Sequence, residues 1–209
     1  MADPLWPYCT PGIPDDRFER LPGIPMTELE VRMLILAQLR LRPDAVLWDI
    51  GAGTGTIPVE VGQLCPGGQI VAIERDEEVA GLIRRNCQRF GVKNVSVVEG
   101  SAPDCLGAIA APSGGSLVDR SLPDCILIEG GQPLQDVLRS AWDYTRPGGR
   151  IVATTSSLEG LYAISEFLAE LQARDIEVVQ SAINRLQRRG IRQSFSAVNP
   201  TFILSGEKG

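Results

Sequence analysis

The chain has 209 residues, of which 44% are hydrophobic and 22% are charged, and its formal net charge is −6. This length and composition fit one globular domain with a full core and exclude a chain that is mainly disordered. Histidine is absent, which excludes hydrolases with a histidine base and imidazole metal sites. The five cysteines form no C-x-x-C pair, so we expect neither a metal site nor a disulfide framework.

Closely spaced prolines predict an irregular N-terminal segment over residues 1–26, followed by a single domain over residues 27–209. The segment has neither a basic start nor an apolar stretch, and no run in the chain reaches the roughly 18 apolar residues of a membrane span. We therefore expect a cytoplasmic protein with no membrane partner. The acidic net charge also disfavours nucleic acid as a partner.

Strand and helix patterns alternate along the rest of the chain. Thr27 and Glu30 have the spacing of a capping box at the first helix, and Gly91 is predicted to cap the third helix at its C-terminus. A stretch rich in glycine and serine, 112–122, is predicted to be a loop. The predicted helices are 27–41, 56–64, 77–90, 102–110, 134–144 and 158–173, and the predicted strands are 45–50, 69–74, 94–99, 124–128, 150–155, 176–183 and 197–204.

This alternation predicts an α/β fold with a doubly wound, mostly parallel seven-stranded sheet, the Rossmann-like arrangement. No helix is predicted between the last two strands, so we expect an antiparallel pair at the end of the sheet.

The strongest motif is the glycine-rich sequence from Asp49 to Gly55, between the first strand and the second helix. Gly51, Gly53 and Gly55 allow a sharp turn and close approach of a ligand to the backbone. Glu74 ends the next strand, where a carboxylate can hold ribose hydroxyls. The spacing is G-x-G-x-G and not the G-x-G-x-x-G of dinucleotide folds, and it resembles motif I of class I S-adenosylmethionine methyltransferases. The alternative is a glycine-rich turn that binds no ligand.

Two further strand ends carry candidate residues. Ser101 and Ala102 follow the third strand, where this fold holds the adenine, although Ser101 is also a candidate helix cap. Glu129 follows the fourth strand and is a weak catalytic candidate between cofactor and acceptor, with a solvated strand-end acid as the alternative. The Asn-Pro-Pro-Tyr typical of amine methyltransferases is absent there, which disfavours a nitrogen acceptor.

A basic cluster lies between the last two predicted strands, with four arginines and no acid in residues 184–192. Arginine forks bind carboxylates in a bidentate manner. In a loop at the sheet edge over the cofactor cleft, Arg185, Arg189 and Arg192 are predicted to bind a polyanionic small molecule. The alternatives are a solvated loop or a contact between subunits.

Nearly the whole chain resembles the CbiT-type precorrin methyltransferases of cobalamin biosynthesis. The distinctive parts are Pro14-Asp-Asp-x-Phe18, Pro25-Met-Thr27 and Glu30-Val-Arg32, together with the glycine motif. The resemblance implies S-adenosylmethionine-dependent methylation of carbon 15 of precorrin-6B, or of its cobalt form, with loss of carbon dioxide from the acetate side chain on ring C. It also implies a homotetramer and a functional pairing with a separate carbon-5 methyltransferase.

Motif and resemblance together imply a set of cofactor-binding residues and no metal site. Two positions depart from the family pattern, since Glu28 stands where many relatives carry Lys and Glu74 where Asp is common. Two alternatives stay open: a transfer RNA adenine methyltransferase with the same core, and a cofactor-binding domain without activity. The implied cofactor residues are Thr27, Asp49, Gly51, Ala52, Gly53, Thr54, Gly55, Glu74, Ser101 and Ala102.

Overall fold

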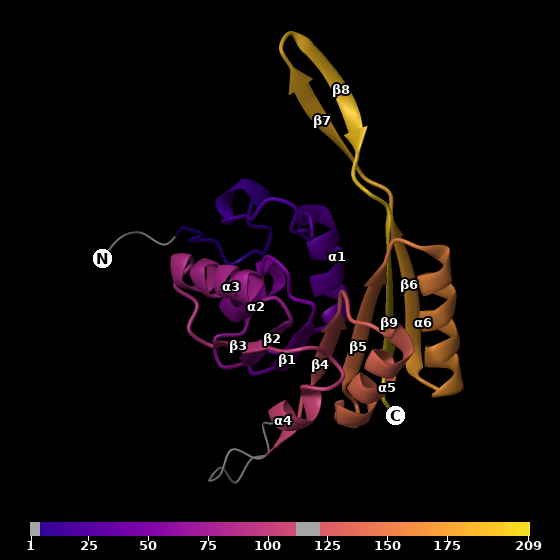
Figure 1. Cartoon of the computed structure of the whole chain (residues 1–209). Helices are drawn as coiled ribbons and strands as arrows, with labels where there is room; N and C mark the ends of the chain where they lie inside the picture. Colours follow the sequence, from indigo (N-terminus) through magenta and orange to yellow (C-terminus); the bar gives the residue numbers. More distant parts are fainter. Residues whose placement is uncertain (1–4, 112–121) are drawn as a thin grey trace.

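The structure, a computed structural model, describes residues 5–111 and 122–209. Its main sheet comprises β1 (Val46–Ile50), β2 (Gln69–Glu74), β3 (Val95–Glu99), β4 (Cys125–Ile128), β5 (Arg150–Thr155), β6 (Arg174–Ser181) and β9 (Thr201–Glu207). The strand order is β3-β2-β1-β4-β5-β9-β6 (Figure 1). Only β9 runs against its neighbours, β5 and β6, which confirms the predicted parallel sheet with an antiparallel end.

Helices cover both faces of this sheet. They are α1 (Leu29–Leu39), α2 (Thr56–Leu64), α3 (Glu77–Arg89), α4 (Leu106–Ala110), α5 (Leu134–Tyr144) and α6 (Leu158–Glu170). The first three pack on one face and the last three on the other (Figure 1). Successive side chains of β1 alternate between the faces, as a strand requires: Leu47 packs with α1 and α2, and Trp48 with α5. The sheet is therefore doubly wound, as predicted.

The ends of α3 show how local sequence sets helix boundaries. The Asp76 carboxylate accepts hydrogen bonds from the backbone N–H groups of Glu78 and Val79, which caps the N-terminus. At the other end Gly91, with φ +70°, donates to Gln88, and the following N–H donates to Cys87. This pattern of two bonds is the Schellman motif, and it confirms Gly91 as the predicted cap.

The predicted capping box of the first helix is wrong. Its N-cap residue is Glu28, which makes no side-chain cap hydrogen bond. The Thr27 hydroxyl instead donates to the carboxylate of Glu129, and the Glu30 carboxylate pairs with Arg185. Both side chains have bound distant partners that local spacing does not reveal.

Other predicted boundaries also differ from the structure. α4 begins four residues later than predicted, after a turn, and α6 ends at residue 170 because the chain enters β6 at residue 174. Of the predicted loop at 112–122, residues 112–121 lie outside the described residues.

A hairpin replaces the arginine-rich loop that the sequence predicted. Its strands β7 (Asn184–Arg189) and β8 (Arg192–Ala197) pair with each other and with no strand of the main sheet. The Val198 N–H donates to the Ile183 carbonyl at 2.9 Å and closes the base of the hairpin. Figure 1 shows the hairpin extending well away from the sheet. The last predicted strand, 197–204, therefore divides between the end of β8 and β9.

From residue 5 onward, the described part of the N-terminal segment is irregular apart from one 3-10 turn, η1 (Asp15–Arg17), yet it packs into the core. Ile13 and Phe18 are buried against α3. The fully buried Arg32 of α1 fixes the segment, because its guanidinium donates to the Ile13 carbonyl, to Asp15 and to Glu60 of α2.

All five cysteines are free, three of them buried, one half-buried and Cys9 exposed. The described residues contain no group of histidine, cysteine or carboxylate side chains suited to a metal ion. Within the same residues, no helix is long and apolar enough to cross a membrane.

Candidate functional site

A cavity of about 860 Å³ opens at the carboxyl ends of the parallel strands. Its walls come from the loops after β1, β2, β3, β4 and β5 and from residues 24–28 before α1. The strand order reverses between β1 and β4, and such a switch point is where open α/β sheets bind ligands. The cavity is therefore the candidate site by its position in the fold.

The glycine loop after β1 forms one wall. Gly51 has φ +83°, and a Cβ there would lie 3.0 Å from the backbone nitrogen of Gly130 in the loop after β4. Gly55 has φ +82°, and a Cβ there would lie 2.9 Å from Ile83 of α3. The first glycine thus brings two cavity loops into contact, and the second seats the loop on a neighbouring helix.

Glu74 lies at the end of β2 in the same cavity. Its carboxylate accepts hydrogen bonds from the backbone N–H groups of Gly53 at 3.1 Å, Arg75 at 2.9 Å and Asp76 at 3.2 Å. These bonds hold the acid beside the glycine loop with its carboxylate at the cavity wall.

Asp49 lies directly behind the cavity, at the position before the lining residue Ile50. Its side chain is fully buried, and neither carboxylate oxygen has a hydrogen-bond partner among the described residues. Burial, with the charges of Glu129 and Glu74, raises the pKa of Asp49 well above its usual range. A buried acid with two unused acceptors is prepared for a donor that a ligand brings.

Glu129 follows β4 and projects into the cavity wall. The Thr27 hydroxyl donates to both of its oxygens, at 2.8 and 3.1 Å. Burial raises the pKa of Glu129 to about 7, and the Thr27 bond and the charge of Arg32 oppose this only in part. Glu129 is therefore a partly buried acid within the site and not a solvated strand-end acid.

Some of the predicted cofactor residues line the cavity, and others lie behind its wall. Ser101 is exposed at the rim and caps no helix, since α4 begins only at residue 106, whereas Ala102 is buried in the wall. Gly55 lies behind the wall, as Asp49 does. The predicted residues that line the cavity are Thr27, Gly51, Ala52, Gly53, Thr54, Glu74, Ser101, Ala102 and Glu129.

Neither Arg185 nor Arg192 of the predicted arginine site lines the cavity. Arg185 is held by acids of the body, with 2.9 Å to Asp15 and a close ion pair to Glu30. Arg192 is exposed at the start of β8, near the hairpin tip, and does not line the cavity. Arg189 ends β7, and its side chain lies outside the described part of the structure.

Sequence reasoning missed the hydroxyl-bearing residues Thr154, Thr155 and Ser156, which line the cavity at the carboxyl end of β5. The signal was present, because β5 is a parallel neighbour of β4 and its carboxyl end must meet the same edge. Asn199, which precedes β9, completes that side of the cavity.

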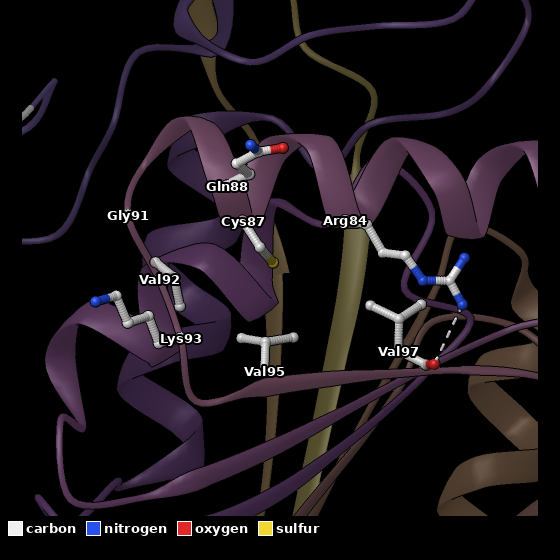
Figure 2. Close-up of a pocket in the computed structure, with 8 residues that line it drawn as sticks. All are labelled: Arg84, Cys87, Gln88, Gly91, Val92, Lys93, Val95 and Val97. Atoms are coloured by element: carbon white, nitrogen blue, oxygen red, sulfur yellow. Dashed lines mark hydrogen bonds between the residues drawn. The ribbon is translucent and has the colours of Figure 1, made fainter.

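A second cavity of about 500 Å³ lies between α3 and the edge strand β3 (Figure 2). Arg84 covers that edge, donating to the Val97 carbonyl and pairing with Glu99 at 2.7 Å. None of the predicted site residues lines this cavity, so it is not the candidate site.

The comparisons with known proteins agree with this geometry. Residues 21–208 match the family model described as precorrin methyltransferase domain. A protein of Pyrobaculum calidifontis named "Probable cobalt-precorrin-6B C(15)-methyltransferase (decarboxylating)" is 40% identical over 96% of this chain and 97% of its own length. A Salmonella typhimurium cobalt-precorrin-6B C(15)-methyltransferase (decarboxylating) is 31% identical over 93% of this chain and 95% of its own.

Solved structures give the same result. A Geobacter metallireducens precorrin-6y C5,15-methyltransferase superposes with a TM-score of 0.81 at 32% identity, covering 95% of this chain and 98% of that one. A Methanobacterium thermoautotrophicum precorrin 8W decarboxylase has a TM-score of 0.79 at 30% identity, covering 93% of this chain and 98% of that one. A transfer RNA (m1A58) methyltransferase from Aquifex aeolicus has a TM-score of 0.71 at 16% identity, covering 91% of this chain and 72% of that one. This likeness shows a shared fold alone.

Fold and site together define a methyltransferase of the Rossmann-like class. The family model matches most of the chain, and the relatives match it nearly end to end. These matches also identify the family. The chain belongs to the precorrin methyltransferases.

Proposed function

We propose that the protein methylates carbon 15 of precorrin-6B, or of its cobalt form, with S-adenosylmethionine, and removes carbon dioxide from the acetate side chain on ring C. The observation that carries the proposal is the match to the precorrin methyltransferase domain over residues 21–208, with the cavity bordered by the matched residues. When bound, S-adenosylmethionine supplies the methyl group as an electrophile.

The residues present fit that cofactor. The two unpartnered oxygens of Asp49 suit a cationic amino group, and the Glu74 carboxylate suits ribose hydroxyls. Gly53 leaves the backbone of the loop open to a ligand, because it carries no side chain on the cavity wall, and Gly51 lets the loop lie against Gly130. Ser101 and Ala102 supply the far wall after β3, on the adenine side.

For the methyl-transfer step, we expect this chain without histidine to rely on positioning and on exclusion of water. The cavity provides both, because its walls come from the loops after five strands and hold Thr27 and Glu129 in fixed orientation. A conjugated tetrapyrrole carbon is already electron-rich, so methyl transfer to it needs no strong base.

Substrate binding by the hairpin arginines remains a prediction for Arg189 and Arg192. Arg192 is free of carboxylate partners among the described residues, whereas Arg185 is committed to Asp15 and Glu30. Arg192→Ala is expected to weaken tetrapyrrole binding and to leave cofactor affinity unchanged.

The hairpin also supports a homotetramer. Leu186, Ile191 and Phe195 on it are 55%, 102% and 72% exposed, and exposed apolar side chains on a projecting element favour self-association. A pairing with a separate carbon-5 methyltransferase is proposed on the resemblance alone.

The test is to incubate the protein with precorrin-6B and S-adenosylmethionine labelled in its methyl group. Mass spectrometry is expected to find a product that has gained one labelled methyl and lost the mass of one carbon dioxide. Transfer of label to transfer RNA would favour the alternative methyltransferase. Cofactor binding in calorimetry without methyl transfer to either acceptor would favour the cofactor-binding domain without activity.

A further inference from the structure

Removal of carbon dioxide from an acetate group requires a proton donor, which methyl transfer does not. The bond between the CH2 carbon and the carboxyl carbon breaks, and its electron pair stays on the CH2 carbon or in the conjugated ring. A methyl group forms only when that carbon then gains a proton. Some acid in or near the cavity must deliver it, because an accurate product requires the proton at one defined carbon.

We propose that Glu129 is this acid: its carboxyl O–H breaks as a C–H bond forms at the former acetate carbon, and the carboxylate left behind regains a proton from solvent through the cavity. The proposal rests on the proposed function. Atoms and charge balance, since a side-chain carboxylate plus one proton yields a methyl group plus neutral carbon dioxide.

Position supports the assignment. Glu129 lines the cavity, and Gly130 beside it is in backbone contact with Gly51 of the glycine loop, where a Cβ would approach its nitrogen to 3.0 Å. The acid is thus anchored next to the loop that the cofactor is proposed to occupy. Glu28 also lines the cavity, but its side chain is 38% exposed and lies 3.9 Å from the Arg185 guanidinium, so it is the poorer proton donor.

Burial keeps Glu129 protonated. The charge of Arg32 from α1 lowers the Glu129 pKa, whereas the charges of Glu129 and of Glu74 from β2 raise the pKa of Asp49 in β1. Burial dominates these effects and raises the pKa of Glu129 to about 7. A substrate rich in carboxylates would disfavour a second negative charge in the same cavity still further.

Thr27 positions the acid. Its hydroxyl has one hydrogen to donate and lies within reach of both Glu129 oxygens, so it orients the carboxyl group while the carboxyl's own proton stays available to a substrate. Arg32 fixes Thr27 by donating from Nη1 to its carbonyl at 2.6 Å. Thr27 is therefore a positioning residue, and its removal should change how Glu129 titrates.

The experiment follows single turnovers of Glu129→Gln and of the matched control Glu99→Gln, whose carboxylate ends β3 outside the cavity. One signal is transfer of labelled methyl, and the other is deuterium entering the new side-chain methyl in D2O. In Glu129→Gln we expect methyl transfer within about twofold of the unmodified protein, and deuterium entry slower by about 10²- to 10⁴-fold. Glu99→Gln should leave both rates unchanged.

Calorimetry with S-adenosylmethionine shows whether the variant is folded. The proposal is overturned if Glu129→Gln binds the cofactor and changes neither rate, or slows both rates equally. Failure of the proposed function looks different, because the unmodified protein would then transfer no methyl to precorrin-6B.

The pH profile tests Thr27. The unmodified protein should lose the deuterium-entry rate as pH rises through about 7, where Glu129 ionises. Because the Thr27 bond lowers the Glu129 pKa, Thr27→Val should move this loss to higher pH, and Thr27→Ser should restore the original profile. An unmoved profile in Thr27→Val would contradict the positioning role.

Discussion

Arg32 of α1 and Glu60 of α2 form an ion pair whose side chains are 0% and 1% exposed, with 2.6 Å between Nε and Oε1. The same guanidinium reaches Asp15, and Asp15 in turn pairs with Arg185 of the hairpin. This network joins the N-terminal segment, two helices and the hairpin. A buried charge is tolerated only when it is paired and hydrogen-bonded, so the buried Arg32 depends on these partners.

Arg32→Met is expected to lower the free energy of unfolding by about 3–5 kcal/mol, because it leaves the Glu60 carboxylate buried without its cation and with only the backbone N–H groups of Gly12 and Ile13 as donors. Denaturant unfolding measures the loss. The matched control is Arg40→Met, which removes exposed pairs with Asp175 and Glu177 and should cost much less. Equal losses of unfolding free energy in the two variants would mean that the buried ion pair matters no more for stability than the exposed one.

Asp49→Asn is expected to weaken S-adenosylmethionine binding by about 10- to 100-fold, the value of a charge-assisted hydrogen bond of about 1.5–3 kcal/mol. Isothermal titration calorimetry measures the affinity, with Glu99→Gln as the carboxylate control outside the cavity. An unchanged Kd would remove Asp49 from the cofactor site.

Gly51→Ala is expected to destabilise the protein by more than Gly148→Ala. Both glycines have positive φ, +83° and +73°, so each alanine costs about 1–2 kcal/mol in backbone strain. Only at position 51 would the new Cβ also approach backbone atoms, at 3.0 Å from the Gly130 nitrogen; at position 148 nothing lies within 4 Å. The difference in Tm between the two variants measures the cost of the close contact at position 51. Equal Tm values would show that the loops after β1 and β4 move apart without loss of stability.

The stability of the ligand-free protein should fall as pH rises from about 4.5 to 7. In that window the folded state keeps a proton on Glu129 that the unfolded state has released, because the folded pKa is raised from 4.5 to about 7. Asp49, whose pKa is also raised, acts in the same direction. Denaturant unfolding at several pH values should show a shallower slope in Glu129→Gln, and a slope identical to that of the unmodified protein would count against a proton held on this acid.

Excision of the hairpin tests the proposed assembly. A two-residue Asn-Gly turn in place of residues 184–197 would join Ile183 to Val198, which are already hydrogen-bonded. Light scattering is expected to report a smaller assembly, while circular dichroism and cofactor binding stay unchanged. An unchanged mass would exclude the hairpin from subunit contacts.

The sheet and the glycine loop were predictable because their signals are local: short apolar runs, and glycines directly after a strand. The capping box failed because Thr27 binds Glu129, 102 residues away, and Glu30 binds Arg185, 155 residues away. The hairpin was missed because it lies outside the main sheet, and its apolar side chains Leu186 and Phe195 are exposed, so no buried face marks it in the sequence.

The position of β9 has a consequence for synthesis of the protein. It follows every other strand in the chain, yet it lies between β5 and β6 and pairs with both. While the ribosome still holds this segment, a nascent chain has a gap in its sheet and two unpaired strand edges, which are the surfaces most prone to aggregation. Premature termination before residue 201 would leave that gap permanently open.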